Sequence, residues 1–205
     1  MDMLYSQGQA TRQRALLNWA ESTQGLHEIL PDYHRLQVEH WVWSNCGKLG
    51  RYVMDVGQSE TPRRWVGDRY FTLGFSESDI GGDLLNLPLA PCSLDGVILT
   101  EVLEHCTDPA RAVREVYRVL KHGGTLLVTS PFFWPWHGCG EYEDYWRFTD
   151  QGWALLLCEF SSVKITPCDW TEEGGFLYDQ LRRWECFGLS EETKATTGYL
   201  VEAVK

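Results

Sequence analysis

Residues 94–105 read LDGVILTEVLEH, and residues 110–130 read ARAVREVYRVLKHGGTLLVTS. The apolar run at 94–100 is typical of a buried strand, and the second stretch begins with apolar residues at helical spacing. We interpret Gly123-Gly124 as the stop of that helix and the β-branched run at 125–130 as the next strand. A strand, a helix and a second strand in this order predict parallel strands joined by a helical crossover.

The same alternation continues on both sides of this unit. Further strands are predicted at 51–55, 70–73, 80–83, 163–166 and 199–204, and further helices at 12–22, at 32–42, at 149–158 and around Leu177, Leu181 and Trp184. The fold class is therefore α/β: a doubly wound, mostly parallel seven-stranded sheet with N-terminal helices. We expect residues 1–50 to form an N-terminal helical extension and residues 51–205 to form one compact unit.

The charge balance restricts the partners of the protein. The 205 residues include 18 Lys and Arg against 29 Asp and Glu, a net charge of −11. An acidic chain lacks the basic face that sequence-independent nucleic-acid binding or attachment to anionic membranes requires. The chain has no apolar run of about 20 residues, and its N-terminus lacks the apolar core of a signal peptide. We expect a soluble, cytoplasmic protein without a nucleic-acid or membrane partner; its oligomeric state stays open.

The cysteines do not indicate a metal or disulfide framework. All 7 lie outside any CxxC pair, and the odd number leaves one over in a full pairing scheme. His137 and Cys139 are the nearest approach to a ligand set, and two ligands do not close a metal site. The sequence therefore predicts reduced cysteines and no metal.

Four motifs occur in a fixed order: GDLLNLPL at 82–89, LDGVILTEVLEH at 94–105, Asp108-Pro109, and EVYRVLKHGG at 115–124. Together they resemble the class I S-adenosylmethionine-dependent methyltransferases, in particular those of methyltransferase type 11. DYWRFT at 144–149 is similar to a motif in a subgroup of that family. The resemblance is dense from Tyr52 to about Phe160. It implies a Rossmann-like methyltransferase domain, S-adenosyl-L-methionine as the cofactor and a small-molecule substrate.

The resemblance also implies where the cofactor binds, at the residues that follow the strands. These are Asp55, Val56, Gly57, Glu77, Asp83, Leu84, Thr100, Glu101 and Val102. By the family pattern Asp83 accepts a hydrogen bond from the adenine amino group, although Asp83 also suits the cap of a turn. Ser59 and Thr61 replace two glycines of the family, and Gly74 replaces the acid that holds the ribose, with Glu77 as its substitute. We therefore predict weak cofactor binding for this family.

Residues 131–148, PFFWPWHGCGEYEDYWRF, contain eight aromatic residues. A loop this apolar after a strand is typical of a pocket wall, although the rings could simply cover the edge of the core. The predicted substrate pocket consists of Phe132, Phe133, Trp136, Tyr145, Trp146 and Arg147. His137 is the candidate catalytic base, because its ordinary pKa lies near neutrality.

Three charged or titratable residues near this tract have more than one interpretation. Arg147 could bind an acidic substrate group or pair with Asp144. His105 could contact a ligand or hydrogen bond to nearby backbone, and Glu104 is expected to pair with a basic residue or with solvent.

Three functions remain to be compared. The first is methyl transfer from S-adenosylmethionine to an oxygen, nitrogen or carbon atom of a small molecule. The second is a methyltransferase-like protein without transfer activity that serves as a binding module or partner subunit. The third, a nicotinamide-dependent oxidoreductase, is disfavoured because no GxGxxG follows the first predicted strand of the sheet.

Overall fold

The computed structural model of the chain describes residues 33–57, 66, 69–74, 78–140, 142–168 and 196–205. The predicted helices at 12–22 and around Leu177–Trp184, and the candidate Glu77, lie outside these residues. The described strands are β1 Tyr52–Val56, β2 Arg69–Gly74, β3 Ile80–Gly81, β4 Leu94–Thr100, β5 Leu120–Pro131, β6 Ser162–Pro167 and β7 Gly198–Val204. The helices are α3 Tyr33–Asn45, α4 Pro109–Val119 and α5 Asp150–Leu156, with short 3₁₀ turns η1 Cys46–Lys48 and η3 Leu103–His105.

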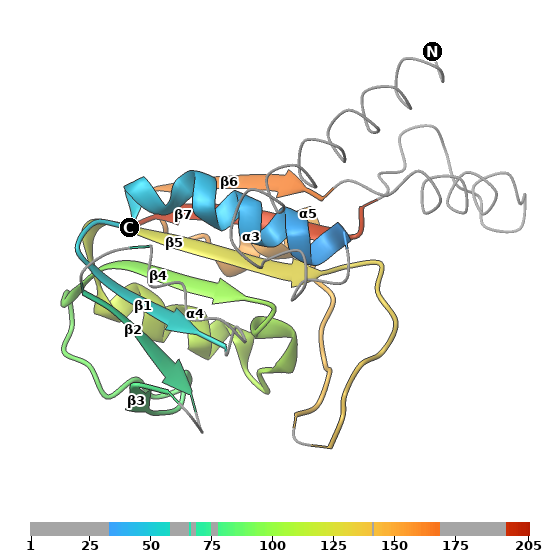
Figure 1. The fold of residues 1–205 in the computed structure, drawn as a ribbon, viewed down its shortest axis with the longest axis horizontal. Coiled ribbons are helices and arrows are strands. Elements are labelled where there is room, and N and C mark those ends of the chain that lie inside the picture. Colours follow the sequence, from blue (N-terminus) through green and yellow to red (C-terminus); the bar gives the residue numbers. More distant parts are fainter. Residues whose placement is uncertain (1–32, 58–65, 67–68, 75–77, 141, 169–195) are drawn as a thin grey trace, which may run out of the picture.

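The strands form one seven-stranded sheet in the order β3-β2-β1-β4-β5-β7-β6 (Figure 1). The pairs from β3 to β5 are all parallel, and β7 runs antiparallel to both β5 and β6. This arrangement confirms the predicted α/β class and the mostly parallel sheet.

The alternation of side chains along the central strands divides the core into two layers. Val53, Ile98 and Leu127 point to one face of the sheet, where Val42 of α3 packs with them and is fully buried. The residues next to them in sequence belong to the larger cluster that also contains the apolar residues of α4 and α5. Figure 1 shows α3 on one side of the sheet and α4 and α5 on the other. Helices on both faces fit strands that are buried on both sides.

The junction between α4 and β5 corrects the predicted role of Gly123-Gly124. The helix begins after Asp108, whose side chain caps it by accepting from Arg111 N at 2.9 Å, and it ends at Val119. Gly123-Gly124, predicted as the helix stop, lies inside β5 instead. A Cβ at Gly124 would lie only 3.1 Å from the Asp95 carbonyl oxygen, and the pairing register between β4 and β5 shifts there. Gly124 therefore allows a close approach of two strands at an irregularity of the ladder.

The carboxyl ends of the central parallel strands lie at one edge of the sheet. In the ladders, Val56 of β1 pairs with Leu99 of β4, and Thr100 pairs with Thr129 of β5. The segment from β5 to α5 leaves from this edge and runs beyond the strands (Figure 1). Ligands of open α/β sheets bind at such an edge. Among the residues that the structure describes, no helix is both long and apolar enough to span a membrane.

Candidate functional site

The turn after β1 is built around Gly57. This residue has φ +90°, in the left-handed region that favours glycine, and a Cβ there would lie 2.5 Å from Val102 Cγ2. Asp55, at the end of the strand, is buried and accepts a hydrogen bond from the Tyr70 hydroxyl at 2.7 Å. Val56 next to it is part of the core. The structure thus brings the predicted residues after β1 against those after β4 and keeps side-chain atoms out of the turn.

The turn after β4 is fixed by Glu101. Its φ is +56°, and its backbone N–H donates to the Thr129 carbonyl oxygen at 3.3 Å. Its carboxylate accepts from the Thr129 hydroxyl at 2.6 Å and lies 3.3 Å from His34 Nε2 of α3. Burial acts to raise the pKa of Glu101, but the hydrogen bond and charge of His34 outweigh burial and lower it. A charged carboxylate therefore ties α3, β4 and β5 together next to Gly57, and Thr100 before it is buried.

Asp83 lies in the turn after β3, where it forms an isolated bridge with Asn86. Its Oδ1 accepts from Leu85 N at 2.8 Å, so the capping role is present. The side chain is exposed, and its Oδ2 accepts no hydrogen bond within the described ranges of the chain. Leu84 beside it is buried in the core. Asp83 can therefore cap its turn through one oxygen and accept from a ligand through the other.

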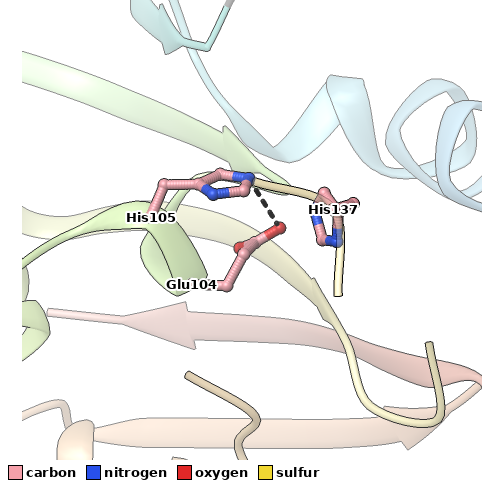
Figure 2. A group of neighbouring side chains, drawn as sticks. All are labelled: Glu104, His105 and His137. Carbon is pink, nitrogen blue, oxygen red and sulfur yellow. Dashed lines mark ion pairs between the residues drawn. The ribbon is translucent and has the colours of Figure 1, made fainter. Parts of the chain in front are cut away.

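Glu104, His105 and His137 form a cluster that sequence reasoning did not assemble. Their potential ligand atoms all lie within 4.8 Å of one another. The Glu104 side chain is 0% exposed, and neither of its oxygens has a hydrogen-bond partner among the residues described. Figure 2 shows its carboxylate between the two imidazole rings, with Oε1 3.6 Å from His105 Nε2. Of the two neighbours expected for Glu104, a basic residue or solvent, the structure places a basic residue, His105, beside it and excludes solvent.

Two physical effects set the charge of this cluster. Burial, reinforced by the negative charge of Glu101, raises the pKa of Glu104 well above its usual range. Burial also lowers the pKa of His105.

The sequence signal that could have found the cluster is the adjacent Glu-His at 104–105 together with a later histidine. Their separation of 32 residues hides the contact until β5 and the loop after it are placed.

The two histidines are oriented through Nδ1. His105 Nδ1 donates to the Glu143 carbonyl oxygen at 2.6 Å, so this nitrogen carries the proton and Nε2 is left as an acceptor. His137 Nδ1 lies 3.1 Å from Asp144 Oδ2 and 3.2 Å from the Pro135 carbonyl oxygen. The His137 Nε2 has no hydrogen-bond partner in the portion of the chain that is described. Each ring is thus held at one nitrogen and open at the other.

Of the two roles predicted for Arg147, the structure shows the ion pair with Asp144. Its Nη2 donates to Asp144 Oδ2 at 2.8 Å and to the carbonyl oxygens of Trp134 and Pro135. The hydrogen bond from Arg147 lowers the pKa of Asp144 to about 2. The guanidinium therefore stabilises the loop. This geometry favours the internal ion pair over contact with an acidic substrate group.

The remaining pocket candidates divide by exposure. Phe132 packs against Tyr199, with ring centroids 5.8 Å apart, and belongs to the core margin. The others are Phe133, Trp136, Tyr145 and Trp146, whose exposed fractions are 49%, 70%, 50% and 41%. Trp146 is oriented by a hydrogen bond from its ring nitrogen to the Cys106 carbonyl oxygen at 2.8 Å. Exposed rings next to a ligand edge are suited to an apolar molecule.

Comparison with known proteins gives one family match and partial matches to curated relatives. Residues 41–128 match the model of a family described as a methyltransferase domain. A probable S-adenosylmethionine-dependent methyltransferase of Mycobacterium tuberculosis is 37% identical over 83 residues, which are 40% of this chain and 29% of that protein. The chloroplastic 2-methyl-6-phytyl-1,4-hydroquinone methyltransferase of Spinacia oleracea is 31% identical over 106 residues, 51% of this chain and 27% of that protein. The chain thus spans less than a third of the length of these relatives.

A solved structure has the same fold. The crystal structure of a SAM-dependent methyltransferase from Archaeoglobus fulgidus superposes with a TM-score of 0.58, covering 87% of this chain and 97% of that chain at 15% identity. At this identity the likeness establishes the shared architecture of the sheet.

Proposed function

Because this chain belongs to the class I S-adenosylmethionine-dependent methyltransferase family, we propose that it transfers a methyl group to an oxygen, nitrogen or carbon atom of a small molecule. The observation that carries the proposal is the joining of two turns at the ligand edge: Gly57 after β1 lies against Val102 after β4. This is the position at which open α/β sheets bind their ligands.

The residues present at this edge fit the cofactor. Gly57 has no side chain of its own, so the backbone of its turn can be approached closely. Asp83 Oδ2 is an exposed acceptor suited to the adenine amino group, and Leu84 lies beside it. S-adenosylmethionine would supply a methyl group on a positively charged sulfur. Thr100, Glu101 and Val102 line the turn, and Glu101, held by Thr129 and His34, keeps that turn in one conformation.

The acceptor is proposed to lie against the exposed rings of the tract at 131–148. Six large aromatic side chains there are more than a third exposed. Rings of this kind contact flat or apolar molecules with little loss of side-chain entropy. The hydroquinone methyltransferase of Spinacia oleracea is a relative whose named substrate has an aromatic ring and a long apolar chain. We therefore favour an apolar, ring-bearing acceptor. Positioning two reactants in this way can contribute roughly 7–11 kcal/mol to catalysis.

The sequence favours His137 as the group that removes a proton from the acceptor. The structure holds its ring through Asp144 and leaves Nε2 open, as a base requires. A ring nitrogen of His137 also lies within 4.8 Å of ligand atoms of Glu104 and His105. We place the acceptor next to this cluster. Because Glu104 and His105 lie beside His137, we assign the three residues a shared role at the acceptor.

A transfer assay tests the proposed function. The whole chain is incubated with S-adenosylmethionine and a series of phenols, hydroquinones and amines, and the formation of S-adenosylhomocysteine is measured. We expect formation of this product above the protein-free rate with at least one ring-bearing acceptor, and its loss in Gly57→Val. Cofactor binding without product in the whole series would instead support the second function, a binding module without transfer activity.

A further inference from the structure

We propose that Glu104, His105 and His137 bind a divalent transition-metal ion of the zinc class. The sequence alone indicated no metal, because it offered only His137 and Cys139 as neighbouring ligands. The fold replaces that pair with a different set, in which η3 supplies two ligands and the loop after β5 supplies the third (Figure 2).

The chemistry of the three donors defines the class of ion. Two imidazoles and one carboxylate are the ligand set of many catalytic zinc sites, and imidazole also suits iron, cobalt and nickel. Magnesium and calcium prefer sets made of oxygen atoms, so they fit this cluster poorly. Three protein ligands leave a coordination position open for water or a substrate atom.

The separations are close to those that a shared ion requires. Ligand atoms that each lie ~2.1 Å from a tetrahedral ion are roughly 3.4 Å apart. His105 Nε2 and Glu104 Oε1 are 3.6 Å apart, and no pair among the three ligand atoms exceeds 4.8 Å. A rotation of the half-buried His137 ring about its side-chain bonds would have to close the remaining gap when an ion binds.

The buried carboxylate is the observation that points to a ligand. Glu104 has no exposed surface and no hydrogen bond to either oxygen within the described residues, and it faces the two rings. A buried carboxyl group without hydrogen-bond partners destabilises the folded state. Coordination of an ion would satisfy it.

The surrounding groups have the arrangement that metal sites use to orient their histidines. Ligating imidazoles usually donate their second N–H to a carbonyl or carboxylate oxygen. His105 donates to the Glu143 carbonyl oxygen, and His137 has Asp144 and the Pro135 carbonyl oxygen beside Nδ1. Arg147 in turn holds Asp144. His105 is therefore held with its Nε2 toward Glu104, and the His137 ring is held beside the same carboxylate.

The open coordination position is next to the aromatic tract. The ring of Tyr142, which is 45% exposed, lies 4.6 Å from that of His105. The ion would thus face the surface proposed for the acceptor and could bind an acceptor oxygen or nitrogen directly, with His137 acting as a ligand in place of the free base; this part of the inference rests on the proposed function.

Cobalt(II) is the probe, because its visible absorption reports the ligands that it binds. The whole chain is stripped with a chelator, dialysed and titrated with Co²⁺ without S-adenosylmethionine, and Zn²⁺ is then added in competition. We expect a visible band that saturates at one ion per chain, no thiolate charge-transfer band, displacement by Zn²⁺ and no displacement by an equal concentration of Mg²⁺.

Variants separate this site from other ligands. Glu104→Gln and His137→Ala should each weaken Co²⁺ binding more than 100-fold, and Asp144→Asn about 10–100-fold, as for other groups that orient ligands. Cys139→Ser and His122→Ala, at exposed positions outside the cluster, should bind Co²⁺ like the parent. Far-UV circular dichroism establishes that each variant is folded, and His137→Ala remains informative if the buried Glu104→Gln does not fold.

Either of two results overturns the proposal: no saturable band with the parent protein, or a band that survives in folded His137→Ala. Because the titration contains no S-adenosylmethionine, its outcome is separate from the test of the proposed function. Stoichiometric Co²⁺ binding together with absent methyl transfer would leave the metal site standing and remove the enzyme activity.

Discussion

Glu101 and Thr129 are joined twice, by a hydrogen bond between their side chains at 2.6 Å and by one between Glu101 N and the Thr129 carbonyl oxygen at 3.3 Å. This pair fixes the turn after β4 to the neighbouring strand β5. Glu101 has a φ of +56°, a backbone conformation that residues other than glycine rarely adopt. The bonds to Thr129 hold it there, next to Gly57.

Thr129→Val should therefore destabilise the protein. The substitution preserves shape but leaves a buried carboxylate oxygen without its hydroxyl donor, which costs about 1.5–3 kcal/mol of unfolding free energy. Urea unfolding measures the loss. Thr125→Val, in the same strand at a buried position without a side-chain hydrogen bond in the described part, should change the unfolding free energy by less than about 0.5 kcal/mol. Equal losses in the two variants would show that the bond to Glu101 contributes little.

Gly57→Ala should remove cofactor binding, and Gly123→Ala is its matched control. Both glycines have positive φ, +90° and +78°, so alanine costs each about 1–2 kcal/mol. Only at Gly57 does the new Cβ meet a neighbour, Val102 Cγ2 at 2.5 Å, whereas the space at Gly123 is open. We expect both variants to lose a similar amount of unfolding free energy through backbone strain, and Gly57→Ala to lose more through the clash. Only Gly57→Ala should abolish the binding of S-adenosylhomocysteine. Unchanged binding in folded Gly57→Ala would contradict the proposed site.

Asp83→Ala should weaken binding of S-adenosylhomocysteine about tenfold or more, the effect of losing at least 1.4 kcal/mol. Asp108→Ala is the control, because Asp108 also caps a turn of backbone, by accepting from Arg111 N, at the start of α4. Both variants lose one capping hydrogen bond of about 1 kcal/mol. Calorimetric titration of the two separates the capping role from contact with the cofactor. If both variants bind like the parent, Asp83 only caps its turn.

Glu115 should make the stability of the protein depend on pH. Its carboxylate pairs with Arg118 Nη2 at 2.8 Å and accepts from Leu87 N at 2.9 Å. The hydrogen bond from Arg118 lowers the pKa of Glu115 below its ordinary value of about 4.3. A carboxyl group with a lowered pKa stabilises the folded state above its unfolded pKa, and this contribution is lost as the pH falls through the folded pKa.

The comparison uses Glu115→Gln with Glu159→Gln, an exposed carboxylate, as the control. At pH 7 the Glu115 variant should be less stable by about 1 kcal/mol, discounted for partial exposure. The difference should shrink as the pH is lowered from about 4.3 towards 3, when urea unfolding is repeated at each pH. A difference that is the same at pH 7 and pH 3 would mean that the charge of Glu115 has no part in it.

The fold could be predicted largely from the sequence, because apolar runs and helical spacing are local. β4, for example, is mostly apolar, and the sequence pattern predicts it at 94–100, the bounds it has in the structure. The sequence pattern places the start of the next strand at 125, whereas β5 begins at Leu120. Gly124 is required by the close approach to the Asp95 carbonyl oxygen on the neighbouring strand, which local pattern does not reveal.

The site was predictable in part. Strand ends identify the sheet edge, so Asp55, Gly57 and Thr100 to Val102 could be grouped in advance. The cluster of Glu104, His105 and His137 could not, because it depends on how the loop after β5 returns to η3 through hydrogen bonds such as Tyr145 N to the Glu104 carbonyl oxygen at 2.8 Å. The ion pair of Arg147 with Asp144 was foreseen as one of two alternatives, and geometry decided between them.

Calorimetric titration of the whole chain with S-adenosylhomocysteine tests the central claim most directly, because it needs no knowledge of the acceptor. The retained Gly57 and Asp83, set against Ser59, Thr61 and Gly74 in place of the family's residues, predict saturable binding of one ligand per chain. The dissociation constant should lie between about 1 μM and 1 mM, equivalent to about −8 to −4 kcal/mol. No heat of binding with millimolar ligand and folded protein would contradict the account.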